Sequence, residues 1–255
     1  MNIQWNAQGY TQNFSFVHEY GSQLLSLIEG QGLSVLDMGC GGGALTCRLA
    51  QAGFQVQGLD ASPELLETAR QTYPGLTFRQ GDAVDFQVPQ PFDVVFSNAV
   101  LHWIDQEKQD RMLCCVNRAL KSGGQFIFEL GGYGNNALIH GALEQAFARR
   151  GLTYQTPFYF PTVGQYAARL ERAGFLVTYA SLFHRPTPLN GPDGLYDWLC
   201  MFIKIPFSGM DPEQREEILR EVTGQLREPL LQEGVWMCDY VRLRCKAVKE
   251  SERLS

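Results

Sequence analysis

The sequence predicts an α/β fold: a doubly wound, mostly parallel sheet of seven strands with an antiparallel last strand, and a small helical cap. Two observations predict it. Short apolar runs alternate with helical patterns over the first half of the 255-residue chain, which is typical of sheets with helices on both faces. A glycine-rich stretch, LDMGCGGGALTCRLA at residues 36–50, joins the first apolar run to the first helical pattern.

Turn and cap signals divide the first half into elements. We expect strands at residues 34–38, 55–59, 76–79, 92–96 and 125–130. Helices are expected at residues 43–52, after Ser62 and Pro63, and from Asp105 to the Gly123-Gly124 pair. Serine at the N-cap and proline at the first helical position suit the free N–H groups of a helix start.

The regular alternation of short strands and helices ends after Gly131. A helix is expected at 162–172, a strand at 175–183, a helix at 211–226 opened by an Asp-Pro-Glu-Gln capping signal, and a closing strand at 236–249. We therefore expect one domain, residues 1–255. Within it we expect an N-terminal helical lid at 1–30 and a helical insertion at 186–235 that forms a substrate cap between the last two strands.

Charge and composition limit the function classes. The net charge of −6 and the lack of a basic run argue against nucleic acid and anionic membranes as partners. No run of 18 apolar residues and no signal-peptide pattern at the start are found. Seven cysteines without a CxxC pair indicate thiols in a reducing cytoplasm. We expect a cytoplasmic monomer or homodimer.

The glycine turn indicates a ligand site, because a strand leading through glycines into a helix brings free N–H groups to the ligand. Two interpretations fit. Gly39-x-Gly41-x-x-Ala44 satisfies the loose dinucleotide fingerprint, whereas Asp37-x-Gly39-x-Gly41-x-Gly43 matches the loop of class I methyltransferases. Asp60, at the end of the second strand and 21 residues after Gly39, suits the hydroxyls of an adenosine ribose under either interpretation.

Three features distinguish the two interpretations. Asp37 lies inside the first strand, where dinucleotide folds carry an apolar residue. Gly81-Asp82-Ala83 follows the third strand, where an acid can accept from an adenine amino group. FDVVFSNAVLHW at residues 92–103 resembles the "FDVVxSNxxLxW" segment of class I S-adenosylmethionine-dependent methyltransferases. The chain resembles that family most strongly over residues 33–131, and its two ends are similar to the small-molecule, type 11 group around trans-aconitate methyltransferase.

The resemblance implies S-adenosyl-L-methionine as cofactor, S-adenosyl-L-homocysteine as product and a set of cofactor-binding residues. The methionine side is expected at Asp37, Gly39, Cys40, Gly41 and Gly43, the ribose and adenine at Asp60, Ala61, Asp82 and Ala83, and the sulfonium side at Asn98 and Ala99. His102 stands where many relatives of the trans-aconitate enzyme carry glutamine, so the acceptor is left open.

The expected reaction is methyl transfer to an O, N or C atom of a small molecule, a carboxylic acid among the candidates. A carboxylate needs no base; for other acceptors His102 is the candidate, with a pocket-shaping role as the alternative. The candidate substrate contacts are Trp103, Glu129, Tyr133, Trp198 and Tyr10. The alternative roles are core packing for the tryptophans and Tyr133, an ion pair for Glu129 and a plain amphipathic helix for Tyr10. Arg185, Arg242 and Arg244 are candidates for pairing with an acidic acceptor.

No histidine spacing predicts a metal site. Two other functions stay open: a nicotinamide-dependent oxidoreductase, favoured only by the loose fingerprint, and a catalytically inactive protein that keeps the adenosyl site. Methylation of protein or nucleic acid is disfavoured by the cap and by the acidic charge.

Overall fold

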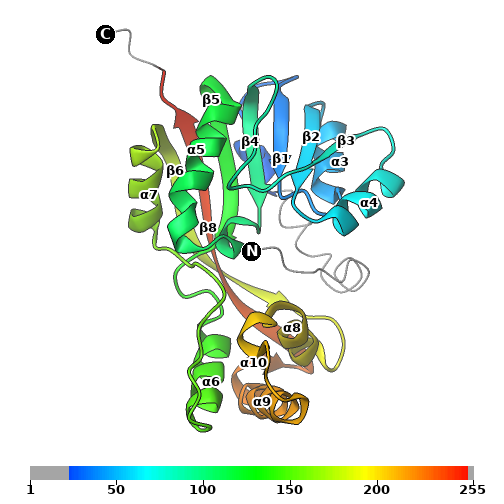
Figure 1. The fold of residues 1–255 in the computed structure, drawn as a ribbon, viewed down its shortest axis with the longest axis vertical. Helices are drawn as coiled ribbons and strands as arrows, with labels where there is room; N and C mark the ends of the chain where they lie inside the picture. Colours follow the sequence, from blue (N-terminus) through cyan, green and yellow to red (C-terminus); the bar gives the residue numbers. More distant parts are fainter. Residues whose placement is uncertain (1–22, 252–255) are drawn as a thin grey trace.

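The computed structural model describes residues 23–251, and its centre is one sheet in the order β3-β2-β1-β4-β5-β8-β6 (Figure 1). The strands are β1 (Ser34–Met38), β2 (Gln55–Asp60), β3 (Thr77–Gln80), β4 (Phe92–Asn98), β5 (Leu120–Gly131), β6 (Phe175–Pro188) and β8 (Val235–Lys249). The two-residue β7 (Leu231–Gln232) pairs only with β8. Neighbours pair in parallel except around β8, which runs antiparallel to β5, β6 and the short β7. The predicted fold class is confirmed.

Local signals place the helices around this sheet. They are α3 (Ala44–Gln51), α4 (Pro63–Thr72), α5 (Gln109–Ala119) and α7 (Val163–Arg172), with 3-10 turns η1 (Leu25–Leu27), η2 (Leu101–Trp103) and η3 (Gln106–Lys108). Ser62 caps α4 by accepting from the Leu65 N–H at 3.2 Å. Thr162 and Gln165 form a capping box at the start of α7.

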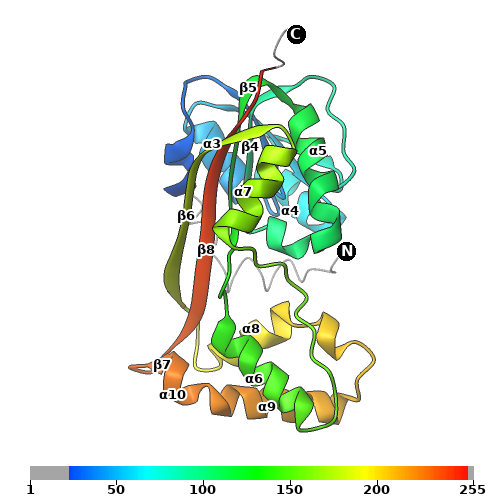
Figure 2. The same cartoon turned by 90° about the vertical axis from the view of Figure 1, so that its left-hand side faces the viewer.

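The sheet is buried on both faces, as its apolar strands require. On one face α3 and η1 cover a cluster that includes Val35, Val94 and Ile127. On the other face α5 and α7 cover a larger cluster that includes Leu36 and Phe126 (Figure 2). Successive residues of β1 thus point to opposite layers. None of the helices in the described part of the chain is both long and apolar enough to cross a membrane.

Beside the sheet lies a helical layer, built from α6 (Ala137–Ala148), α8 (Gly194–Phe202), α9 (Pro212–Gln225) and α10 (Arg227–Leu230), with the 3-10 turn η4 (Ile205–Phe207). We call this layer the cap. It has its own apolar core, which includes Leu143, Leu199 and Ile218. Figure 2 shows the long strands β6 and β8 running from the sheet to the cap. Helices α8, α9 and α10 fall within the insertion expected at 186–235.

Two element predictions were wrong. The sequence analysis did not predict α6, and it missed a signal there. The buried residues of this helix recur at the spacing of one helix face: Ile139, Ala142, Leu143, Ala146 and Phe147. The helix expected to end at Gly123-Gly124 ends at Ala119, because Leu120 already pairs with Phe92 in β5. The glycines lie at an irregularity in that strand pairing, before the ladder resumes at Gln125.

Candidate functional site

The glycine turn follows β1 and is built on backbone that favours glycine. Gly39, Gly41 and Gly43 have φ values of +79°, +52° and +84°. At Gly39 a Cβ atom would lie 2.2 Å from a methyl group of Val100, so a side chain would also clash. The N–H groups of Gly39 and Cys40 donate to the Leu59 carbonyl at 2.7 and 3.1 Å, which ties the turn to the end of β2.

Asp60 ends β2 and faces this turn. Its carboxylate accepts hydrogen bonds from the N–H of Gly41 and the N–H of Ser62, both at 2.8 Å. Burial raises its pKa, and the backbone hydrogen bonds oppose that shift. The carboxylate therefore stands between the glycine turn and the start of α4, held by main chain from both sides.

Asp37 is buried within β1 beneath the turn. Its carboxylate accepts a hydrogen bond from the Thr46 hydroxyl of α3 at 2.7 Å, and burial raises its pKa to about 7. Burial together with the charges of Asp37 and Asp60 also raises the pKa of the Cys40 thiol. Cys40 is thus a neutral packing group at neutral pH, whereas Asp37 is poised to gain or lose a proton near pH 7.

The remaining predicted cofactor residues follow the ends of neighbouring strands. Ala61 follows β2, Asp82 and Ala83 follow β3, and Asn98 ends β4. Ala99 has a φ of +59°, rare for a residue with a side chain, and its N–H donates to the Glu129 carbonyl at 2.8 Å. The structure therefore brings all the predicted cofactor residues to the carboxyl edge of β1–β4, where ligands of such sheets bind.

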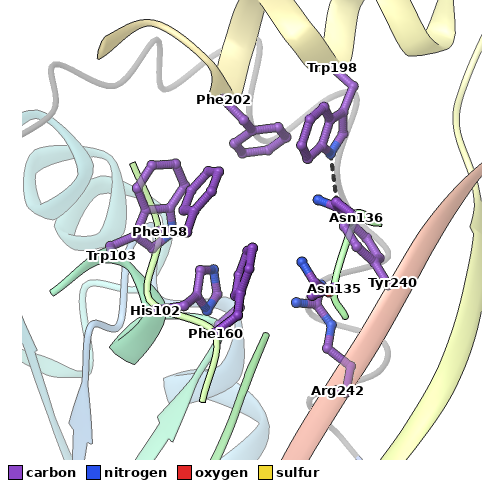
Figure 3. A pocket seen from close by; sticks show the side chains of 11 residues that line it. His102, Trp103, Asn135, Asn136, Phe158, Phe160, Trp198, Phe202, Tyr240 and Arg242 are labelled. Atoms are coloured by element: carbon purple, nitrogen blue, oxygen red, sulfur yellow. Dashed lines mark hydrogen bonds between the residues drawn. The ribbon is translucent and has the colours of Figure 1, made fainter. Parts of the chain in front are cut away.

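A pocket of about 430 Å³, including the part open to solvent, lies between the end of β4 and the cap. Figure 3 shows the side chains that line it. Five segments far apart in sequence contribute: Ala99, His102 and Trp103 after β4; Asn135 and Asn136 after β5; Phe158 and Phe160 before α7; Trp198 and Phe202 from α8; and Tyr240 and Arg242 from β8. We call this space the acceptor pocket, after the methyl acceptor that the sequence analysis expects.

His102 is buried beside the end of β5. The Gly131 N–H donates to its Nδ1 at 3.1 Å, so in the neutral ring the proton is on Nε2. Burial lowers the pKa of His102 well below its ordinary value, and the charge of Arg242 lowers it further. Around neutral pH the ring is therefore an uncharged hydrogen-bond donor through Nε2.

Asn135 and Asn136 have their carbonyl oxygens occupied. Oδ1 of Asn135 accepts from the Val241 N–H at 3.0 Å, and Oδ1 of Asn136 accepts from the Cys238 thiol at 3.5 Å. Both side chains are almost fully buried. Each side-chain amide is therefore oriented so that its Nδ2 group is available to donate a hydrogen bond.

Arg242 is the cation of the acceptor pocket. It is 8% exposed and forms no ion pair with a carboxylate of residues 23–251. Its Cζ lies 4.0 Å from the ring centroid of Tyr240, whose hydroxyl accepts a 2.6 Å hydrogen bond from the Trp198 indole (Figure 3). Burial raises the pKa of Tyr240 well above its ordinary value, so this phenol is protonated. The cap helix α8 thus supports the ring on which Arg242 stacks.

The predicted substrate contacts have different positions. Trp103 and Trp198 line the acceptor pocket. Glu129 is buried instead in an ion cluster, with Arg185 on both of its oxygens at 2.6 and 2.9 Å and the Arg244 Nε at 2.9 Å. Tyr133 is 65% exposed and does not line the pocket. Tyr10, with most of the expected lid, lies outside the described residues.

Sequence reasoning missed Asn135, Asn136, Phe158, Phe160 and Phe202. Two polar residues soon after the end of a strand were a usable signal for the asparagines. Phe202 lies four residues after Trp198, on the same face of α8. No local pattern marks Phe158 and Phe160, which stack at 5.4 Å in an irregular segment.

Comparison with known proteins gives the family. Residues 35–124 match the model of a methyltransferase domain. An uncharacterized methyltransferase of Schizosaccharomyces pombe is 32% identical over 259 residues, which cover 96% of this chain and 98% of the relative. Trans-aconitate 2-methyltransferase of Deinococcus radiodurans is 28% identical over 262 residues, 92% of this chain and 94% of that protein.

Solved structures agree on the fold. A TehB-like SAM-dependent methyltransferase of Corynebacterium glutamicum has a TM-score of 0.56 at 17% identity, covering 96% of this chain and 98% of its own. Phosphoethanolamine N-methyltransferase 2 of Haemonchus contortus, in complex with S-adenosyl-L-methionine, has a TM-score of 0.56 at 18% identity, covering 92% of this chain and 56% of its own. The full-length match to the Schizosaccharomyces pombe protein shows that the chain belongs to the methyltransferase family, and the solved structures show that it has the fold of S-adenosylmethionine-dependent methyltransferases.

Proposed function

We propose that the protein transfers the methyl group of S-adenosyl-L-methionine to a carboxylate oxygen of a small organic acid. The observation that carries this proposal is the polar lining of the acceptor pocket. His102, Asn135, Asn136 and Arg242 all offer N–H donors, and the acceptor atoms of the first three are already occupied. A lining of this kind complements a molecule that presents oxygen acceptors and a negative charge.

The carboxyl edge of β1–β4 fits the cofactor. Bare backbone at Gly39 and Gly41 admits the methionine end, Asp37 lies where it can face the ammonium group, and Asp60 can accept from the two ribose hydroxyls. When bound, the cofactor supplies a methyl group already activated by its sulfonium. The chain itself has to bring the acceptor atom into line, and such positioning contributes up to about 7–11 kcal/mol to a barrier reduction.

The lack of a base in the acceptor pocket favours a carboxylate over an amine or an alcohol. His102 cannot take a proton at Nε2, which already carries one, and its lowered pKa with Arg242 nearby opposes a charged ring. No carboxylate lies among the described lining residues, and Tyr240 is protonated. An ionised carboxylate needs no deprotonation before it is methylated, so the pocket suits it as it stands.

The aromatic walls limit the rest of the acceptor. Trp103 packs edge-on against Phe158 with 4.6 Å between the ring centroids, and the centroids of Phe202 and Trp198 are 5.2 Å apart. The acceptor proposed here is therefore a compact acid, with its charge near Arg242 and its carbon frame against the rings. The name of the Deinococcus relative makes trans-aconitate one member to test, beside other small acids.

The experiment is a radiolabelled methyl-transfer screen with the full-length protein. Each small mono-, di- or tricarboxylic acid is paired with the primary amine and the alcohol of the same carbon frame. The proposal expects label in base-labile esters from acids alone. Arg242→Gln should raise the KM of the acid at least tenfold, whereas Arg220→Gln, on the outer surface of α9, should leave it unchanged.

Label transferred to the amines or alcohols would overturn the proposed acceptor class but not the cofactor. A calorimetric titration tests the cofactor separately. S-adenosyl-L-homocysteine should bind and NADH should not. The reverse result would restore the oxidoreductase interpretation.

A further inference from the structure

The cap contains a second cavity, of about 640 Å³ including the part open to solvent, on the far side of α8 from the acceptor pocket. It lies between α8, η4 and the first turns of α9, and we call it the cap cavity. The residues that matter for its chemistry are Tyr196, Phe207, Met210, Arg215, Glu216 and Leu219. No residue lines both spaces.

The two spaces share one helix. Tyr196 faces the cap cavity, while Trp198 and Phe202 face the acceptor pocket. Residues two apart on a helix point about 200° apart, so α8 separates the spaces with opposite faces. A molecule in the cap cavity would therefore lie against the helix that carries two walls of the acceptor pocket.

The two charged side chains that line the cap cavity, Glu216 and Arg215, differ in the partners they have. Glu216 is fully engaged: one oxygen accepts from the Tyr196 hydroxyl at 2.7 Å and the other from the Arg220 Nε at 2.6 Å. Arg215 forms no ion pair within the described residues. Its Nε is buried without a hydrogen-bond partner there. The cavity thus offers a cation with an unused buried N–H donor, beside a carboxylate that Tyr196 and Arg220 already hold.

Arg215 is placed so that an anion could pair with its guanidinium and contact an apolar wall. Its guanidinium lies beside the Cys200 thiol and over the ring of Phe207, with Cζ 5.7 Å from the ring centroid. Phe207 and Leu219 are buried, and Met210 is half-buried, so the surfaces around the cation are apolar. An aromatic or aliphatic body attached to one carboxylate would use both features.

We propose that the cap cavity is a second ligand site, which binds a small carboxylate with an apolar body through Arg215. It is separate from the acceptor pocket, and the inference does not depend on which acid the enzyme methylates. A ligand bound in the cap cavity would contact α8 between Tyr196 and Cys200, on the face opposite the acceptor pocket.

The test is a titration of the full-length protein with phenylacetate, followed by NMR of methionine methyl groups labelled with ¹³C. Met210 lines the cap cavity, whereas Met38 is buried in the sheet, so the two resonances report location. Assignment comes from Met210→Leu and Met38→Leu. The proposal expects a saturable shift at Met210 with none at Met38, and no shift with uncharged phenylacetamide.

Three variants decide where the probe binds. Arg215→Gln should weaken the phenylacetate Kd at least tenfold, and Arg215→Lys should weaken it less because it keeps the charge. Arg242→Gln, in the acceptor pocket, should leave the phenylacetate Kd unchanged. If Arg215→Gln does not fold, Arg215→Lys carries the comparison.

The proposal is overturned if Met210 does not respond, or if its response survives Arg215→Gln. It is also overturned if Arg242→Gln abolishes binding, because the probe then occupies the acceptor pocket. None of these readouts requires methyl transfer, so failure here is distinguishable from failure of the proposed function.

Discussion

The backbone N–H of Gly131 donates a hydrogen bond to Nδ1 of His102 at 3.1 Å. This contact joins the last residue of β5 to the turn after β4, and it sets the tautomer of a buried imidazole. A main-chain N–H can only donate, so Nδ1 must accept and Nε2 must carry the proton. The end of one strand thereby makes a hydrogen-bond donor of the residue that was the candidate general base.

His102→Gln should keep activity within about tenfold of wild type, because a glutamine amide can both accept and donate. His102→Leu should lose more, since it leaves the Gly131 N–H buried without a partner. Initial rates on the best acid from the screen measure this. A general base contributes about 10²–10⁴-fold, so a loss of that size in His102→Gln, with a wild-type rate that rises through pH 6–7, would restore the base.

Cofactor affinity should depend on pH through Asp37. Its pKa of about 7 in the unliganded protein means that it is largely neutral below pH 7, whereas the cofactor's ammonium group favours the ionised carboxylate. Binding then releases a proton below pH 7. The affinity for S-adenosyl-L-homocysteine should therefore rise with pH up to about 7 and level off above it.

Asp37→Asn should flatten that profile, because the amide keeps the Thr46 hydrogen bond and does not titrate in this range. Stability should show the opposite slope. The raised pKa means that the folded protein holds the proton more tightly than the unfolded chain, so the unliganded protein should lose stability as pH rises from about 4 to 7. Urea unfolding at several pH values measures it, and equal slopes in both proteins would exclude Asp37.

Asp60→Ala should weaken S-adenosyl-L-homocysteine binding at least tenfold. Charge-assisted hydrogen bonds are worth about 1.5–3 kcal/mol each, and the variant also frees the N–H groups of Gly41 and Ser62 that order the site. Calorimetry measures the affinity, and circular dichroism checks that the variant is folded. Glu67→Gln, on the outer face of α4, is the matched control. Wild-type affinity in folded Asp60→Ala would remove Asp60 from the ribose site.

Glu129→Ala should cost stability rather than acceptor recognition. Its carboxylate is 4% exposed and holds two arginines, and removing one member of a buried pair typically costs about 3–5 kcal/mol. Glu221→Ala is the matched control, because this partly exposed carboxylate also pairs with two arginines and should cost about 1 kcal/mol or less. Urea unfolding compares them. Equal stability with a raised acceptor KM would return Glu129 to the substrate contacts.

The residues of the predicted cofactor site could be found from the sequence because they lie at the ends of strands. Gly39, Asp60 and Asn98 each lie at or just after the end of a strand that reads clearly from its own residues. In a parallel sheet these ends meet at one edge whatever the loops between them do. Cap signals at Ser62 and Thr162 are likewise local, because they depend on hydrogen bonds within one helical turn.

The acceptor pocket could not be predicted in this way. Its lining comes from five segments, one of which adjoins the unpredicted helix α6. Arg185, Arg242 and Arg244 were equivalent candidates in sequence. Only the pairing of β8 with β5 and β6 separates them, by placing Arg185 and Arg244 on Glu129 and leaving Arg242 in the pocket.

The sequence by itself determined the class of sheet, the glycine turn and the acidic residue after β2, because each depends on residues close together in the chain. The tertiary structure alone decided the chemistry of the acceptor side. Whether His102 or Asn135 donates or accepts depends on which of its atoms is already bonded to a main-chain N–H, from Gly131 and Val241 respectively. Those partners lie 29 and 106 residues away, and no local pattern encodes them.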